Sequence, residues 1–220
     1  MKICFLSSGN GGNLKFIYLA NKMGFLKNLE LYVVADRECG SIDFAKSRNI
    51  YNKLIKYKRD DNKELLFELE NINPDIIVTT WYKIIDEETV SKYQGKMINL
   101  HYSLLPAFGG LIGIEPIKQA YEMNCQFIGA TCHYVDKNVD TGKIISQYSM
   151  KNTYNIDKDI QKIFEGGCLI LLNSIINILI KNGKIENTFN EYEIENFSPN
   201  LKFDNTVFNN DFWKYLCSLR

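Results

Sequence analysis

Short apolar runs alternate with helical patterns over the first hundred residues, and this alternation constrains the fold more than any other feature of the chain. The runs are rich in Ile, Val and Leu, which is typical of strands covered on both faces. Residues 13–24 and 60–73, which lie between such runs, place apolar side chains at helical spacing. This order predicts an α/β fold with a doubly wound, mostly parallel sheet. The five expected strands are residues 2–7, 29–36, 52–57, 75–80 and 97–100.

The second half of the chain predicts two further strands and one long helix. The strands are expected at residues 126–135 and 142–150, and the helix at Asp157–Lys181, where Ile and Leu recur at helical spacing. The most apolar part of this helix, residues 168–180, is shorter than a membrane span and contains two Asn and one Ser. It is therefore predicted to be a core helix, and no membrane partner is expected.

The composition changes after Gly183, where Asn and aromatic residues become frequent and alternate weakly with other residues. We therefore divide the chain into a main domain, residues 1–182, and a C-terminal arm or hairpin, residues 183–220. Such an arm is expected to pack on the main domain or on a second subunit. The second arrangement would make the protein a homodimer.

The balance of charges and the placement of the cysteines limit the classes of partner. The 26 basic residues equal the 26 acidic ones in number and form no basic block, so nucleic acid is not an expected partner. The six cysteines are scattered without a CxxC pair, which argues against a zinc site or a disulfide framework and indicates a reducing cytoplasm. The first apolar run is too short for a signal peptide, and no metal is expected.

The first stretch suited to chemistry is SSGNGGNL, residues 7–14, a glycine-rich turn between the first expected strand and the first expected helix. Free backbone N–H groups and a helix N-terminus at such a place favour an anion, for example a phosphate. The stretch lacks the GxGxxG spacing of a dinucleotide site and the GKS or GKT of a P-loop. A tight turn that merely needs glycine explains it equally well.

The second stretch is MINLHYSLLPAFGG, residues 97–110, in which Asn99 and His101 are two positions apart. On a strand they leave the same side, at or just past the carboxyl end, where open α/β sheets bind their ligands. A histidine can move protons near neutral pH, and an Asn amide can donate a hydrogen bond to a developing oxyanion. The competing explanation is an Asn that closes a turn and a histidine bonded to a backbone carbonyl.

The third stretch is HYVDKNVDTGKII, residues 133–145, an Asp-rich loop between two expected strands. Taken alone, Asp136 and Asp140 are explained as ordinary turn residues. The presence of all three stretches in this order gives each of them more weight than it has alone.

Together, GNGGNL, INLHYSLLP and VDKNVDTGKII resemble the signature of the formyltransferase family that uses 10-formyltetrahydrofolate as co-substrate, over roughly residues 1–182. The resemblance implies a Rossmann-like formyltransferase fold for this catalytic domain, with Asn99, His101 and Asp140 as the catalytic trio. It also implies a site for the pterin of the folate and a site for the acceptor and its phosphate. The folate-binding residues would be Trp81, Tyr82, Lys83, Ile84, Ile85, Val135 and Val139, and the acceptor-binding residues would be Gly11, Gly12, Asn13 and Pro106.

In the implied reaction a neutral amine attacks the formyl carbon, and Asn99 together with a protonated His101 stabilises the resulting oxyanion. A carboxylate at Asp140 would favour the imidazolium form of His101 and relay the proton lost by the amine, directly or through water. His133 is expected to order the loop that carries Asp140 rather than to react.

The acceptor is predicted by comparing two branches of the family. The glycine-rich turn is similar to that of the glycinamide ribonucleotide transformylases of purine synthesis. Three departures argue against that branch. The segment TTWYKII at residues 79–85 resembles nucleotide-sugar N-formyltransferases, the turn after SLLP is about three residues longer, and Cys168 and Leu169 replace a Glu-His pair. We therefore predict a nucleotide-linked amino sugar as the acceptor, with glycinamide ribonucleotide as the alternative.

Three other activities rank lower. The methionyl-tRNA branch would need a larger and more basic C-terminal domain. A hydrolase that removes the formyl group would use the same trio, but that branch resembles chains with a regulatory domain in front, and here the expected sheet starts at residue 2. A non-catalytic binding protein would keep the scaffold with a degenerate acceptor pocket.

Overall fold

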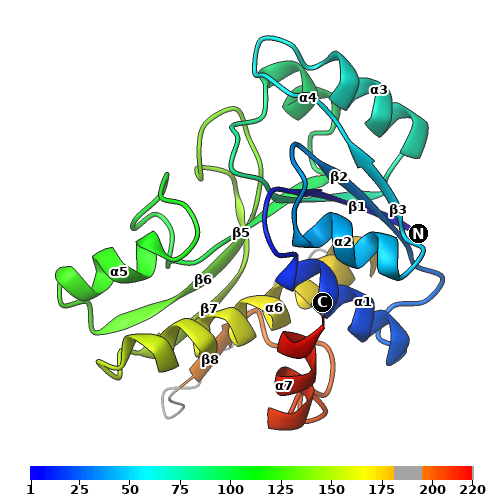
Figure 1. Ribbon diagram of the computed structural model, residues 1–220. Helices are drawn as coiled ribbons and strands as arrows, with labels where there is room; N and C mark the ends of the chain where they lie inside the picture. The colour runs from blue at the N-terminus through cyan, green and yellow to red at the C-terminus, as the bar shows by residue number, and fades with distance from the viewer. Residues whose placement is uncertain (181–194, 220) are drawn as a thin grey trace. The chain divides into compact units, whose positions relative to one another are not determined.

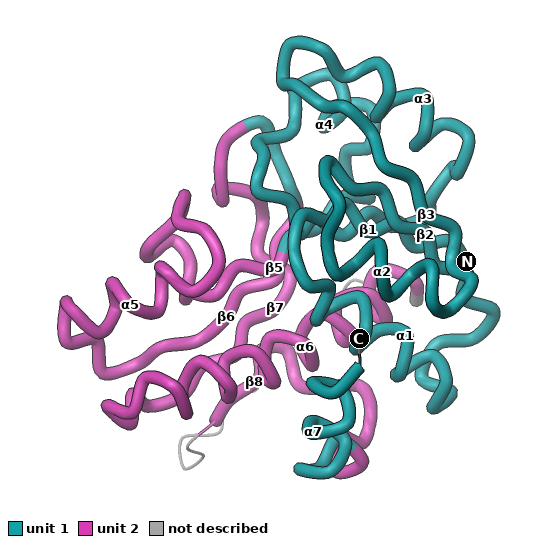
Figure 2. Tube along the Cα trace, viewed as in Figure 1, with its two compact units in different colours: residues 1–99, 135–137, 208–220 teal, residues 100–134, 138–207 magenta. Residues whose placement is uncertain are grey.

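The computed structural model describes residues 1–180 and 195–219, which form the eight strands and seven helices of Figure 1. The hydrogen-bonding order of the strands is β3-β2-β1-β4-β5-β6-β7-β8. The pairs β2–β3, β1–β2, β1–β4 and β4–β5 are parallel, whereas β6–β7 and β7–β8 are antiparallel. The predicted α/β fold with a mostly parallel sheet is confirmed. The chain divides into two compact units, which are coloured separately in Figure 2.

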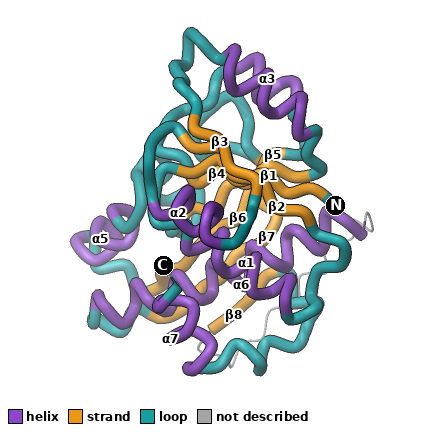
Figure 3. The backbone as a smooth tube through the Cα atoms, turned by 45° about the vertical axis from the view of Figure 1, so that its right-hand side comes forward, coloured by secondary structure: helices purple, strands orange, loops and turns teal. Residues whose placement is uncertain are grey.

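Unit 1 contains residues 1–99, 135–137 and 208–220. It holds the parallel strands, which are among those drawn in orange in Figure 3. The strand order reverses between β1 and β4, and ligands of open α/β sheets bind beyond the carboxyl ends of strands at such a reversal. Its strands are β1 Lys2–Ser7, β2 Glu30–Ala35, β3 Tyr51–Leu54, β4 Ile76–Thr80 and the first part of β5 Met97–His101. Its helices are α1 Gly12–Lys22, α2 Gly40–Ser47, α3 Lys63–Ile72, α4 Glu87–Lys92 and α7 Asn210–Ser218.

Local sequence explains where these elements begin and end. Strands β1 and β4 are apolar on both faces and almost wholly buried, as the continuous Ile, Val and Leu runs predict. Helix α1 ends before Gly24, which has a φ of 88°, a left-handed conformation that glycine adopts easily. The N–H of Phe25 donates to the carbonyl of Ala20 and closes the end of the helix. Helix α4 starts after Asp86, whose carboxylate accepts a hydrogen bond from the N–H of Thr89.

Unit 2 contains residues 100–134 and 138–207 and is built on antiparallel strands. Helix α6 packs on β6 and β7. The ring of Tyr148 lies so close to Gly166 that a Cβ at this position would be 2.4 Å from Cδ1 of the ring, which explains why the residue is glycine. By length and composition α6 could cross a membrane, but most of its apolar stretch is buried, so the prediction of a core helix is confirmed. The elements are α5 Glu115–Glu122, β6 Phe127–Tyr134, β7 Ile144–Lys151, α6 Ile156–Ile180 and β8 Glu195–Ser198.

The described part of the C-terminal segment differs from an arm or hairpin, because it contains the short strand β8 and the helix α7. Asn209 caps α7 through its side-chain oxygen, and the ring of Trp213 stacks on that of Phe16 in α1 at a centroid distance of 5.6 Å. The aromatic residues thus form the buried face of a helix. The predicted boundary between residues 182 and 183 lies outside the described residues, as does Lys181, the predicted end of α6.

Candidate active site

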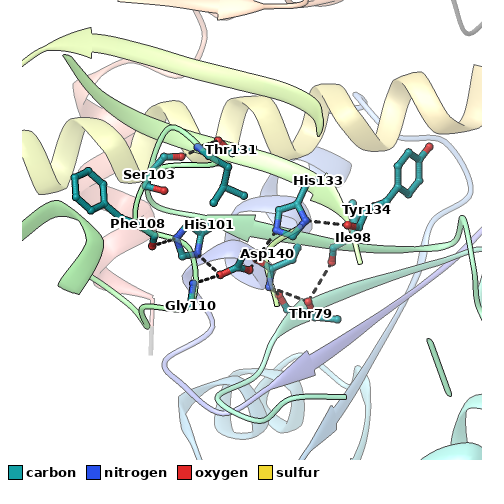
Figure 4. A network of polar contacts seen from close by, with 12 residues as sticks. Thr79, Ile98, His101, Ser103, Phe108, Gly110, Thr131, His133, Tyr134 and Asp140 are labelled. Atoms are coloured by element: carbon teal, nitrogen blue, oxygen red, sulfur yellow. Dashed lines mark hydrogen bonds and ion pairs between the residues drawn. The ribbon is translucent and has the colours of Figure 1, made fainter. Parts of the chain in front are cut away.

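A carboxylate lies between two histidine rings in unit 2 (Figure 4). His101 is the last residue of β5, His133 lies on β6, and Asp140 lies in the loop between β6 and β7. Oδ2 of Asp140 is 3.3 Å from Nδ1 of His101, and its Oδ1 is 3.5 Å from Nε2 of His133. The side chains are 13%, 7% and 2% exposed for Asp140, His101 and His133. The structure therefore brings together two members of the predicted trio and adds His133.

The far side of each ring faces a backbone carbonyl. Nε2 of His101 is 3.0 Å from the carbonyl oxygen of Phe108, and Nδ1 of His133 is 2.8 Å from that of Tyr134. A carbonyl oxygen and a carboxylate only accept hydrogen bonds, whereas a neutral imidazole has one donor nitrogen and one acceptor nitrogen. Both ring nitrogens of His101 thus face acceptors, the carbonyl of Phe108 and the carboxylate of Asp140.

Asp140 is held as a carboxylate. Burial alone would raise its pKa, but a hydrogen bond from His133, the N–H of Gly110 and the positive charge that both histidines can carry together lower that pKa below its ordinary value. The N–H of Gly110 donates to Oδ2 at 2.8 Å. Asp140 itself has a φ of 54°, a left-handed conformation that Asp and Asn tolerate better than most residues.

The loop after β5 shapes this cluster. Phe108 has a φ of 60°, which is strained for an aromatic residue, and its carbonyl is the one that faces His101. The hydroxyl of Ser103 donates to the carbonyl of Ala107, and the hydroxyl of Thr131 donates to the carbonyl of Ser103, so the loop is held at both ends. Pro106 lies on the exposed side of the same loop. A register shift of β6 between Cys132 and His133 is a bulge of the kind that redirects a side chain.

Asn99 lies in unit 1, on β5 two residues before His101. Its Nδ2 donates to the carbonyl oxygen and to the hydroxyl of Thr79 on β4, both at 2.9 Å. The spacing on the strand places Asn99 and His101 on the same side of β5, as the sequence predicts. The sequence pattern does not reveal that both side-chain N–H groups of Asn99 donate to Thr79.

The glycine-rich turn, also in unit 1, has a packing reason for one of its glycines. Gly11 has a φ of 74°, and a Cβ there would lie 2.8 Å from the hydroxyl of Ser41 in α2. Helix α1 begins at Gly12 and has no side-chain cap, and backbone N–H groups at such a helix start can bind an anion. Asn13, in that first turn, is buried. The geometry of the turn suits both explanations that the sequence left open.

The predicted folate-binding residues separate into buried and exposed members. Trp81 and Ile85 are buried in one apolar cluster, against which Val135 packs, and the ring of Trp81 lies 4.7 Å from that of Tyr57. Tyr82, Lys83 and Ile84 are exposed, and the hydroxyl of Tyr82 lies beside Gly9 of the glycine-rich turn. These residues belong to unit 1, whereas Val139 is an exposed residue of unit 2.

Sequence reasoning misses the backbone members of the cluster, namely the Phe108 carbonyl and the Gly110 N–H. The pair Gly109–Gly110 after Phe108 predicts a bend in the chain. It does not predict which backbone carbonyl or N–H group of that bend faces the cluster. The contact between Thr79 and Asn99 is also missed, because it depends on the register of β4 against β5.

Comparison with known proteins identifies relatives of the chain. A family model for "Formyl transferase" matches residues 1–161. The chloroplastic phosphoribosylglycinamide formyltransferase of Vigna unguiculata is 32% identical over 155 residues, which are 66% of this chain and 50% of that protein. The formyltetrahydrofolate deformylase of Bacillus subtilis is 37% identical over 123 residues, 54% of this chain and 40% of that protein. The chain spans about half the length of the curated relatives that it matches.

Solved structures show the same fold. The phosphoribosylglycinamide formyltransferase of Bacillus halodurans superposes with a TM-score of 0.75 at 25% identity, over 84% of this chain and 97% of that one. Glycinamide ribonucleotide transformylase 1 of Geobacillus kaustophilus gives a TM-score of 0.72 at 29% identity, over 79% of this chain and 96% of that one.

Proposed function

Because this chain belongs to the formyl transferase family, we propose that it transfers the formyl group of 10-formyltetrahydrofolate to a primary amine. The observation that carries the proposal is the position of Asp140 between the rings of His101 and His133. An imidazole can gain or lose a proton near neutral pH, and the carboxylate between the two rings can accept hydrogen bonds from them.

The reaction requires charge stabilisation and proton transfer but no change of oxidation state. The amine nitrogen forms a bond to the formyl carbon, and the carbonyl oxygen becomes an oxyanion. The bond from that carbon to the folate nitrogen then breaks, the folate nitrogen takes up a proton, and the amine loses one. His101, as an imidazolium, would exchange the Phe108 carbonyl for the oxyanion, and Asp140 would accept the amine proton, directly or through water. Asn99, two residues before His101 on β5, would contact the reacting groups through its amide.

The two remaining sets of predicted residues have roles in the same proposal. Trp81 and Ile85, with Val135 packed against their apolar cluster, and the exposed Tyr82, Lys83 and Ile84 are the unit 1 residues that would bind the pterin ring, and Val139 is a further candidate in unit 2. The first turn of α1, at Gly12 and Asn13, would bind the acceptor's phosphate. The described residues contain no group of three His, Cys, Asp or Glu side chains placed to hold a metal ion, and the proposed reaction needs none. The scattered cysteines suit a reducing cytoplasm, which is the location in this proposal.

We propose phosphoribosylglycinamide as the acceptor. The sequence departures in residues 79–85 and in α6 favoured an amino sugar nucleotide. Three of the four relatives and solved structures described above, however, are named for phosphoribosylglycinamide, which is also called glycinamide ribonucleotide, and one of these structures matches 84% of the chain. The uncapped first turn of α1 suits the phosphate of either acceptor.

A second candidate function is hydrolysis of 10-formyltetrahydrofolate, in which water replaces the amine. The similarity to a deformylase over 123 residues favours it, and His101 and Asp140 would serve the attack by water in the same way.

The decisive experiment follows release of tetrahydrofolate from 10-formyltetrahydrofolate with no amine, with phosphoribosylglycinamide and with a panel of amino sugar nucleotides. Mass spectrometry of the product identifies the formylated amine. Release only in the presence of phosphoribosylglycinamide supports the proposal. Release with an amino sugar nucleotide alone would restore the acceptor predicted from the sequence, and release without any amine would identify a hydrolase.

A further inference from the structure

Thr79 and Asn99 are paired across the parallel strands β4 and β5 in unit 1. The two side-chain N–H groups of Asn99 end on two atoms of Thr79, its carbonyl oxygen and its hydroxyl, both at 2.9 Å. The Thr79 hydroxyl in turn donates to the carbonyl of Ile98 at 3.3 Å, a contact drawn in Figure 4. Thr79 is only 5% exposed. Its hydroxyl is therefore a buried polar group whose bonds all lie along β5.

This contact fixes which way the amide of Asn99 faces. An Asn side chain has two N–H donors and one carbonyl acceptor, and here Thr79 takes both donors. The reversed amide would place Oδ1 against the Thr79 carbonyl, so that two acceptors would face each other without a hydrogen between them. Oδ1 is the atom left over, and within residues 1–180 and 195–219 no group donates to it.

We propose that Thr79 is a positioning residue that makes Asn99 act through Oδ1, as the acceptor of a hydrogen bond from the attacking amine. This inference rests on the proposed formyl transfer and replaces the donor role that the sequence predicts for Asn99. An amine N–H becomes more acidic as its nitrogen bonds to the formyl carbon, so a hydrogen bond to Oδ1 strengthens on the way to the transition state. The oxyanion is then stabilised by His101.

The next residue on β4 offers a matched control. The hydroxyl of Thr80 also donates to a backbone carbonyl, that of Leu6 at 3.1 Å, but it lies toward β1 and makes no bond with Asn99. Thr79→Val and Thr80→Val each remove one hydroxyl from adjacent positions of one strand with little change of volume. Thr79→Ser keeps the hydroxyl and serves as the rescue.

The first measurement is independent of activity. In the full ¹⁵N-labelled chain, the side-chain NH₂ signals of Asn99 are identified by their loss in Asn99→Ala. We expect both protons to exchange slowly with solvent in the wild type, in Thr79→Ser and in Thr80→Val. In Thr79→Val one of them should exchange at least tenfold faster, because one of two hydrogen bonds is lost. Rapid exchange of both protons in the wild type would overturn the proposed contact.

The second measurement is turnover with 10-formyltetrahydrofolate and phosphoribosylglycinamide. Thr79→Val should lower kcat by about threefold to tenfold, the equivalent of one hydrogen bond, with an unchanged KM for the folate. Thr79→Ser and Thr80→Val should stay within twofold of the wild type. A Thr79→Val enzyme with normal kcat would show that Thr79 is only structural. If the wild type has no turnover, the proposed function fails, while the exchange data still decide the contact.

The third measurement separates the acceptor role from the donor role. A stable analogue of 10-formyltetrahydrofolate, with a carbon in place of the folate nitrogen that carries the formyl group, is added to the ¹⁵N-labelled chain. If Asn99 acts through Oδ1, its two N–H groups stay on Thr79 and keep their slow exchange. A shift and faster exchange of these signals on binding would mean that they turn to the formyl oxygen, which would overturn the proposal.

Discussion

Two aspartates, Asp86 before α4 and Asp140 before β7, are both mostly buried carboxylates with a lowered pKa, but their surroundings differ. Asp86 is surrounded by donors that belong to the fold and do not change their charge near neutral pH. Asp140 receives one backbone N–H, that of Gly110, and otherwise faces two histidine rings.

The partners of Asp86 account fully for its position. Burial would raise its pKa, but hydrogen bonds from the N–H and hydroxyl of Thr89, from Asn62 and from Tyr57 lower it. The N–H and hydroxyl of Thr89 lie at 2.8 and 2.7 Å from the carboxylate, and the Asn62 amide lies at 2.6 Å. Asp86 is thus a helix cap with every oxygen engaged, which identifies it as structural.

The comparison teaches that burial and a lowered pKa do not identify a catalytic carboxylate. What separates the two residues is whether their partners can exchange protons. Histidine changes its charge near neutral pH, so the partners of Asp140 can pass a proton while those of Asp86 only hold it in place.

The largest expected effect is on activity. His101→Ala removes the imidazole beside Asp140 and should lower kcat for formyl transfer by about a hundredfold to a thousandfold. Turnover is followed by release of tetrahydrofolate, and circular dichroism verifies that the variant is folded. A loss of less than tenfold would show that His101 does not stabilise the reacting charge.

Asp86→Ala tests the other half of the comparison. It leaves four hydrogen-bond donors without their carboxylate and removes the cap of α4, so the free energy of unfolding should fall by about 3 kcal/mol. Urea unfolding measures this change. The kcat per folded molecule should remain within twofold of the wild type, and a large loss of kcat in a stable Asp86→Ala variant would contradict the structural assignment.

The smallest expected effect is on stability in acid. Because the pKa of Asp140 is lowered in the fold, its contribution to stability is present above the ordinary carboxyl value of 3.8 and is lost as the pH falls through the folded value. The difference in unfolding free energy between the wild type and Asp140→Asn should therefore shrink as the pH falls from about 5 to below 4. A difference that grows toward low pH in urea titrations would reverse the sign of the shift.

The long elements of the fold can be predicted from the sequence because their patterns are local. Strands β1 and β4 follow continuous apolar runs, and α6 follows a helical repeat of Ile and Leu. The short helices α2, α4 and α5 are harder, since six to eight residues show too little of a period. Asp86 followed by Thr89 was an available start signal for α4, because the pair forms its cap.

The sequence predicts the side chains of the candidate site better than it predicts the backbone atoms and contacts around them. His101 and Asp140 come from motifs of side chains, which a sequence displays directly. The Phe108 carbonyl depends on a left-handed backbone that only the folded loop imposes, and the Thr79 contact depends on the register of two strands distant in sequence. Helix α7 is not predicted because the weak alternation of aromatic residues after Gly183 favours a hairpin, although Asn209 is an available N-cap and Trp213 packs on Phe16.

The most direct test of the whole account is Asp140→Asn, measured for both turnover and thermal midpoint beside the wild type. Asn tolerates the left-handed backbone at this position and keeps an acceptor for the Gly110 N–H, so the midpoint should stay within about 3 °C. The rate of formyl transfer should fall by about a hundredfold or more, because the charge that holds the imidazolium and takes up the proton is gone. An Asp140→Asn protein that unfolds, or one that turns over at near-normal rates, would show that Asp140, like Asp86, has only a structural role.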